Sequence, residues 1–354
     1  MKKYYKRLTP NPFCSLTPSI DTIAKLTLAV LTPHILMLFF TESFRSLLLL
    51  ACVLCAAHLS RFCYAFIKKS KMFFSWSTVL QGMLIGMFLP DSYPPAAAFF
   101  TAFAVLLFND MIFDGFAQSW ANTVVFTLMI LYFMHPDLFP PFFLAHDYFS
   151  HQNAGSRLFS ANILQPLRFD SAITAFFNKT VFNDHGGNMP EGYITLLWDF
   201  RCGIPAFRFN IFTLLASLVL IARKAADALI PFIFLSVYAI AVRLFGLYPY
   251  GGIIGGGDIL LALCTGGTLF AAFFMLGWFG TTPMTLAGKC IYAGLGGVIM
   301  FCMCGCGTAS AGVLFTLMFL NIISPLIQYA EDVLYSFKLH KILVHAGIKG
   351  ADSE

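Results

Sequence analysis

The sequence predicts an all-α polytopic membrane protein, with about ten transmembrane helices arranged as two inverted five-helix halves. Hydrophobic residues make up 58% of the 354-residue chain and charged residues only 11%, and no soluble domain of this size needs so much apolar surface. Apolar stretches close to the length of a bilayer span fill most of the chain. One long polar interruption divides them into two groups of five, and an odd number of spans gives the groups opposite orientations.

The apolar stretches are bounded by proline, glycine and charged residues, which place the expected spans in order along the chain. The first group occupies residues 21–41, 44–67, 76–90, 95–113 and 121–135. The second group occupies residues 209–222, 227–246, 257–278, 287–304 and 309–329. Two of the stretches, 76–90 and 209–222, are shorter than the ~20 residues that cross a bilayer upright. Each is expected either to be a half-helix or to begin inside protein.

Lysine and arginine predict which side of the membrane each loop faces. With a cytoplasmic N-terminus and ten spans, most basic residues of the tails and short loops fall inside, and the short outside loops hold little beyond Arg45 and Arg243. The expected order is a cytoplasmic arm, a first five-helix half, an extracytoplasmic loop, a second five-helix half and a cytoplasmic tail, at residues 1–20, 21–135, 136–208, 209–329 and 330–354. The absence of a clustered basic face with interleaved aromatic residues argues against nucleic-acid binding.

The second half carries the clearest motifs. It contains Gly257-Asp258-Ile259-Leu260-Leu261, then Thr265-Gly266-Gly267-Thr268, and later Leu320-Asn321-Ile322-Ile323-Ser324-Pro325. The first half contains Gly115-Phe116-Ala117-Gln118-Ser119-Trp120-Ala121-Asn122 and a short span that runs from Gln81-Gly82 to Leu89-Pro90. Together these motifs resemble the family shared by the D subunit of the Rnf electron-transport complex and the B subunit of the sodium-translocating NADH:quinone reductase. The resemblance is clearest over residues 257–328.

The resemblance implies a flavoprotein. This family carries FMN through a phosphoester to a threonine hydroxyl, in an Asp-x-x-Ser/Thr-Gly-Ala-Thr motif on the extracytoplasmic loop. In this chain Ser171 stands three residues before Thr174, as in the motif, whereas Ala172-Ile173 replaces Gly-Ala and Asp170 is two residues closer than the motif's acid. The resemblance makes Thr174 the candidate attachment residue, with Asp170 and Ser171 beside it. The alternative is an ordinary loop threonine.

A second flavin site is implied between the helices. The amides of Gln118 and Asn122 donate and accept together, so they could contact the edge of a flavin ring. Gly266, Gly267 and Thr268 offer a stretch with little side-chain bulk, where a flat ring could approach the backbone. FMN is the expected cofactor, with riboflavin as a candidate for this inner site. The alternatives are structural, with amides that cap or join helices and glycines that let two helices pack closely.

Three acidic residues are candidates for an ion path. Asp258 follows three glycines whose backbone carbonyls could face a cation, and it is also suited to cap a helix N-terminus. Asp110 and Asp114 lie near the inner end of the fourth expected span, where carboxylates either mark ion routes or lie at the water interface. No metal site is expected, because the three alternating cysteines between residues 302 and 306 point apart at helical pitch.

The preferred function follows from the resemblance. It implies a membrane subunit of an Rnf-type ion-translocating electron-transport complex, multi-pass in the bacterial inner membrane, which relays electrons through FMN coupled to cation transport. The expected partners are other membrane and peripheral subunits of the complex. The alternative is a small-solute channel or secondary transporter without flavin, because Gly-rich breaks, short spans and inverted halves suit that function equally. A flavinless scaffold within the complex is a third option.

Overall fold

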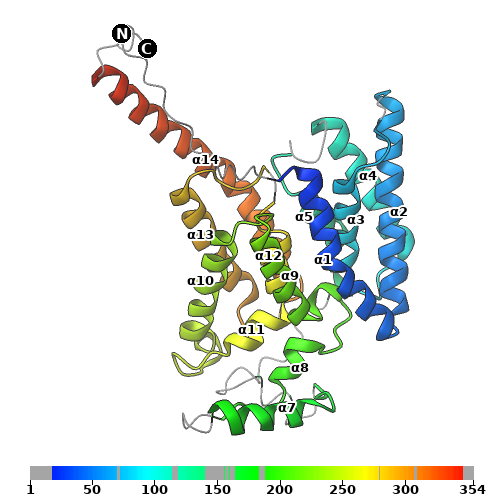
Figure 1. Cartoon of the computed structure of the whole chain (residues 1–354), viewed down its shortest axis with the longest axis vertical. Helices are drawn as coiled ribbons and strands as arrows, with labels where there is room; N and C mark the ends of the chain where they lie inside the picture. Colours follow the sequence, from blue (N-terminus) through cyan, green and yellow to red (C-terminus); the bar gives the residue numbers. More distant parts are fainter. Residues whose placement is uncertain are drawn as a thin grey trace, which may run out of the picture.

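The structure is a computed structural model, and it describes residues 18–69, 72–113, 119–139, 155, 159, 164–182, 188–278, 280–306 and 309–345. Within these residues every regular element is helical, and none is a strand (Figure 1). Six of the described helices are long and apolar enough to cross a membrane, and three apolar helices are shorter: α3, α5 and α9. The all-helical membrane architecture is therefore confirmed, while the number of ten spans stays a prediction.

The first half consists of α1 (Ile20–Phe40), α2 (Phe44–Ile67), α3 (Trp76–Phe88), α4 (Pro95–Phe113) and α5 (Thr123–Met134). These helices match the expected spans to within two residues at nearly every end. Local chemistry explains the ends. The Ser19 hydroxyl caps α1 by accepting from the Thr22 N–H, and α3 stops at Phe88 because Leu89 precedes a proline and has extended backbone. A short 3-10 helix, η1 (Pro136–Leu138), follows α5.

The second half consists of α9 (Asn210–Ala222), α10 (Leu229–Phe245), α11 (Ile259–Thr265), α12 (Thr268–Phe274), α13 (Leu286–Cys304) and α14 (Gly312–His345). The expectation of one span over 257–278 is therefore wrong in detail. That stretch forms two short helices, which are interrupted at Gly266–Gly267. The last helix is longer than predicted, since α14 continues to His345 and projects beyond the other helices.

The two halves repeat one packing pattern. In the first half α2 packs on α3 and α4, α1 packs on α3, and α4 packs on α5. In the second half α10 packs on α11, α12 and α13, α9 packs on α12, and α13 packs on α14. Contacts of α1 with α9 and of α14 with α5 join the halves. At the first of these junctions His34 Nε2 and Thr213 Oγ1 form a buried hydrogen bond of 3.1 Å.

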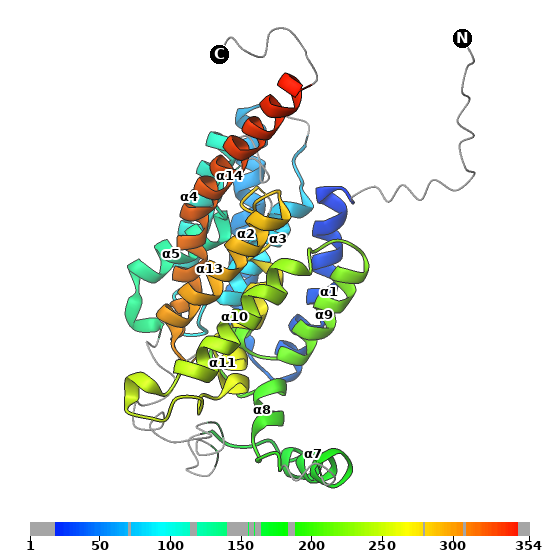
Figure 2. The same ribbon diagram turned by 90° about the vertical axis from the view of Figure 1, so that its left-hand side faces the viewer.

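The halves also run in opposite directions. Two further helices, α7 (Asp170–Phe177) and α8 (Tyr193–Trp198), lie at one end of the molecule, which we call the α7 end. The free part of α14 projects from the opposite end, the α14 end. Figures 1 and 2 show that α1 runs from the α14 end to the α7 end, whereas α9 starts near α8 and runs back. Short elements complete this region: a π-helix (Asn178–Phe182) and the 3-10 helices η5 (Pro205–Phe207) and η6 (Tyr248–Tyr250).

Candidate functional site between the two halves

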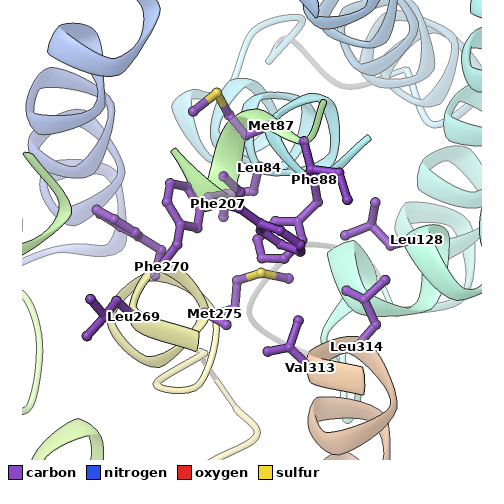
Figure 3. Close-up of a cluster of buried hydrophobic side chains, with 14 of the residues drawn as sticks. Leu84, Met87, Phe88, Leu128, Phe207, Leu269, Phe270, Met275, Val313 and Leu314 are labelled. Atoms are coloured by element: carbon purple, nitrogen blue, oxygen red, sulfur yellow. The ribbon is translucent and has the colours of Figure 1, made fainter. Parts of the chain in front are cut away.

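The C-terminal end of α3 and the start of α12, just after the helix break, meet in a buried group of apolar side chains, which we call the central apolar cluster. It consists of Leu84, Met87 and Phe88 from α3, Leu269 and Phe270 from α12, and Phe207 from η5, all at most 5% exposed. Figure 3 shows these side chains, with Leu128, Met275, Val313 and Leu314 around them. The Phe88 ring makes edge-on contacts with Phe207 and Phe270, at centroid distances of 5.9 and 5.5 Å. Packed apolar side chains offer no ligand to a cation, so this cluster closes the space between the two halves to ions.

The glycine pair of the second half allows this closure. Gly267 has a φ of +67°, a left-handed conformation that a side chain disfavours. A Cβ atom there would lie 2.2 Å from the Phe207 ring, so the ring rests directly on the backbone of the helix break. Thr268 then starts α12 and is fully buried. The structure thus shows Gly267 in helix packing. A flavin contact of Gly266, Gly267 or Thr268 stays a prediction.

The sequence candidates of the first half have structural partners where the structure describes them. Asn122 caps α5 through its Oδ1, which accepts from the Val124 N–H at 3.0 Å, and its Nδ2 donates to the Met275 carbonyl at 3.1 Å. Asp110 forms a 3.4 Å ion pair with Arg61, which joins α4 to α2 inside the bundle. Gln118 and Asp114 lie outside the described residues.

Asp258 is the N-cap of α11, as one of its two expected roles requires. Its Oδ1 accepts from the Leu261 N–H at 3.1 Å. Its Oδ2 accepts from the Tyr193 hydroxyl at 2.6 Å and from the Gly155 N–H at 3.1 Å. Burial, and then the Asp258 carboxylate, raise the pKa of Tyr193 well above its ordinary value, so the hydroxyl stays a donor at physiological pH. This contact fastens α8 to the start of the interrupted helix.

A cavity that the sequence did not predict lies between α4 and α5. Its volume is about 380 Å³, and its lining includes Asn109, Ser119, Trp120, Thr123 and Phe126. Asn109 is 8% exposed, and its Oδ1 accepts from the Thr123 hydroxyl at 2.9 Å. Its Nδ2 has no hydrogen-bond partner among the described residues. The only sequence signal was indirect, since residues 119–123 directly follow the predicted contact Gln118.

A polar cleft of about 510 Å³ lies at the α7 end, and the sequence did not predict it either. Its strongest contact is a buried ion pair in which Arg208 Nη2 and Nε donate to the two oxygens of Asp199 at 2.7 and 2.8 Å. The Arg208 guanidinium also donates to the hydroxyls of Thr41 and Ser43, in the turn between α1 and α2. Because Arg208 directly follows Phe207, this network holds η5 and its ring in place over the central apolar cluster.

The comparison with known families decides the identity of the fold. The model of the family described as NQR2, RnfD, RnfE matches residues 7–333. The chain belongs to this family. It is 22% identical over 291 residues to the D subunit of an ion-translocating oxidoreductase complex of Actinobacillus succinogenes, covering 77% of this chain and 81% of that protein. It is 24% identical over 254 residues to the D subunit of a proton-translocating ferredoxin:NAD(+) oxidoreductase complex of Clostridium ljungdahlii, covering 71% and 72%.

Membership of the NQR2, RnfD, RnfE family confirms the resemblance on which the prediction of covalent FMN was based, so its attachment residue can be compared with the structure. Thr174 lies within α7 and is only 2% exposed. Its hydroxyl donates to Asp170 Oδ1 at 3.1 Å, and Asp170 is itself fully buried. Ser171, at the start of the same helix, is exposed. A phosphoester on Thr174 does not fit this arrangement, because α7 would have to leave its neighbours to admit it.

Proposed function

We propose that the chain is a membrane subunit of an Rnf-type ion-translocating electron-transport complex in a bacterial inner membrane. The subunit relays electrons through a flavin, and this electron transfer is coupled to the passage of a cation between its two halves. The observation that carries this proposal is the contact of α3 with α12, from halves that run in opposite directions, at a closed apolar cluster. Both relatives are named as D subunits of translocating oxidoreductase complexes. The partners are then the other membrane and peripheral subunits of such a complex.

The proposed cation path runs between the C-terminal end of α3 and the break between α11 and α12. Side chains, not continuous helix backbone, close it at the central apolar cluster, so a small displacement of α12 relative to α3 would open it. Asp258 at the start of α11 and Asp110 in α4 are the carboxylates that we propose for its two ends. Both already have partners, Tyr193 and Arg61, and these contacts would have to exchange during transport.

We expect Phe207→Ala to let cations leak through the complex. The substitution removes a fully buried ring that contacts Phe88 and the backbone of Gly267. The passive cation flux into proteoliposomes that contain the purified complex should rise several-fold without electron donor. The matched control is Phe232→Ala on α10, whose ring is 72% exposed on the outer face. Equal fluxes in the two variants would contradict a path at this position.

We propose that the flavin is held without a covalent bond in the cavity between α4 and α5. Its volume lies in the range of small-molecule sites, and its apolar walls with few polar groups suit an aromatic ring. The Nδ2 of Asn109, which has no described partner, can donate to a ring carbonyl, and Trp120 and Phe126 can pack on the ring face. A bound flavin supplies a centre that exchanges one or two electrons. The protein's residues bind the ring and shield it from water.

Asn109→Leu should lower the flavin content of the complex by about tenfold. The substitution removes the buried Nδ2 donor of the cavity, which has no hydrogen-bond partner among the described residues. The measurement is flavin absorbance per mole of complex, in native detergent and after extraction. The control is Asn321→Leu in α14, where another buried amide also has an Nδ2 without a described partner. Equal loss in both variants would contradict the site. Flux of a small solute through a complex without any flavin would favour the channel or secondary transporter.

A further inference from the structure

We infer that Thr174 carries no covalent flavin in this chain and that Asp170 has taken a structural role, as the centre of a hydrogen-bond cluster that folds the segment between the two halves. We call Asp170, Thr174, Gly192 and Thr195 the Asp170 cluster. Its members come from α7 and from the start of α8, about twenty residues apart in the sequence. All of them are buried.

The Asp170 carboxylate is fully used within this cluster. Oδ1 accepts from the Thr174 hydroxyl at 3.1 Å and from the Gly192 N–H at 2.9 Å. Oδ2 accepts from the Thr195 N–H at 2.7 Å and from the Thr195 hydroxyl at 2.5 Å. A carboxylate with two oxygens accepts about four such bonds, so no acceptor position is left for an incoming group. Multiple donors to one buried carboxylate are also among the stronger hydrogen-bond arrangements in proteins.

The Thr174 hydroxyl is unavailable for modification for two reasons. It is 2% exposed, so a transferring enzyme would have no access to it while α7 is packed on α8. Its proton is also the one donated to Asp170. A phosphoester would replace that O–H bond with an O–P bond, remove the donor, and place phosphate charge beside a buried carboxylate. The two negative groups would repel each other strongly at this depth.

The cluster also fixes the position of α8. Gly192 enters α8 with a φ of +105°, and a Cβ atom there would lie 2.0 Å from the Phe159 ring. The Thr195 hydroxyl accepts from the Leu167 N–H at 3.1 Å, which closes the chain back before α7. The next residue after Gly192 is Tyr193, which holds the Asp258 cap of α11. The Asp170 cluster therefore positions the contact between this segment and the interrupted helix.

Covalent attachment is tested by flavin fluorescence of the full-length chain on a denaturing gel, after co-expression with a flavin transferase. A second version of the chain, with an Asp-x-x-Ser-Gly-Ala-Thr tag inserted after Phe182 and so on the same side of the membrane as Thr174, serves as the positive control. We expect fluorescence from the tagged chain only. We also expect none from untagged Ala172→Gly/Ile173→Ala, in which the Gly-Ala pair is restored beside a hydroxyl that stays buried. A band in the untagged chain that disappears in Thr174→Val would overturn the inference. A band that survives Thr174→Val places the flavin elsewhere and agrees with it.

The structural role is tested by thermal unfolding of the complex or of the full chain in detergent. Asp170→Asn should lower the melting temperature by about 5 °C, because an amide nitrogen cannot accept from the Thr195 donors. Thr174→Val should lower it by a smaller amount, and exposed Ser171→Ala should leave it unchanged. An unchanged melting temperature in Asp170→Asn would overturn the structural role. A non-covalent flavin leaves the chain in denaturant, so this inference and the proposed function can fail separately.

Discussion

Arg208→Ala is expected to lower the free energy of unfolding by about 3–5 kcal/mol, because it leaves the buried Asp199 carboxylate without its partner. The side chains of Arg208 and Asp199 are 8% and 7% exposed, and they make a two-pronged contact at 2.7 and 2.8 Å. The same guanidinium donates to Ser43 at 2.8 Å and to Thr41 at 3.1 Å, so the substitution also releases the turn between α1 and α2. Denaturant unfolding of the detergent-solubilised chain measures the change.

The matched control for this variant is Arg201→Ala in the same cleft. Arg201 is exposed, and substitutions at such positions change stability by only about 0.5 kcal/mol. Arg208→Lys should fall between the two, since a lysine restores the charge but not the two-pronged geometry. Equal losses for Arg208→Ala and Arg201→Ala would show that the ion pair does not hold η5 in place.

The second large effect is expected at the break between α11 and α12. Gly267→Ala should lower the free energy of unfolding by about 2–5 kcal/mol. The substitution adds a Cβ to a residue with left-handed backbone, and that atom would lie 2.2 Å from the Phe207 ring. Gly294→Ala is the control. Gly294 lies inside α13, and nothing lies within 4 Å of an added Cβ. The variant should therefore raise the free energy of unfolding by about 0.5–1 kcal/mol through the higher helix propensity of alanine. The two glycine variants are thus expected to change stability in opposite directions.

A double variant separates the clash from the backbone strain. When Phe207 is already alanine, Gly267→Ala should lower the free energy of unfolding only by the part that comes from the left-handed backbone, about 1–2 kcal/mol. The difference between the two backgrounds measures the contact of the ring with the helix break. No difference would mean that Phe207 does not rest on Gly267 in solution.

The helix boundaries were largely predictable because they depend on local properties of the chain. Apolar length, prolines and glycines placed α1 to α5 and most of the second half to within a few residues. The break inside the stretch 257–278 was not predictable, since a Gly-Gly pair also suits close packing of an unbroken helix. What interrupts the helix in the structure is the left-handed Gly267 with the ring of Phe207 against it, 60 residues away in the sequence.

In the candidate site, too, local contacts could be predicted from the sequence and long-range contacts could not. Helix capping by Asp258 and Asn122 follows from a neighbouring turn, and the sequence named it as one of two options for each. The burial of Thr174 depends on Gly192 and Thr195, so the motif around Thr174 gave no sign of it. The Arg208 contacts reach residues more than 160 positions earlier. Such long-range pairings arise from tertiary packing and leave no local pattern.

We propose that two oppositely oriented halves hold a closed path, with the α7 end on the extracytoplasmic side of the membrane and the α14 end on the cytoplasmic side. Labelling of intact cells with a membrane-impermeant maleimide tests it most directly, using Ser171→Cys in α7 and Ser336→Cys in α14, both at exposed positions of a chain whose native cysteines are replaced. We expect Ser171→Cys to react in intact cells and Ser336→Cys to react only after permeabilisation. Reaction of both positions from the same side, or the reverse order, would contradict this membrane topology.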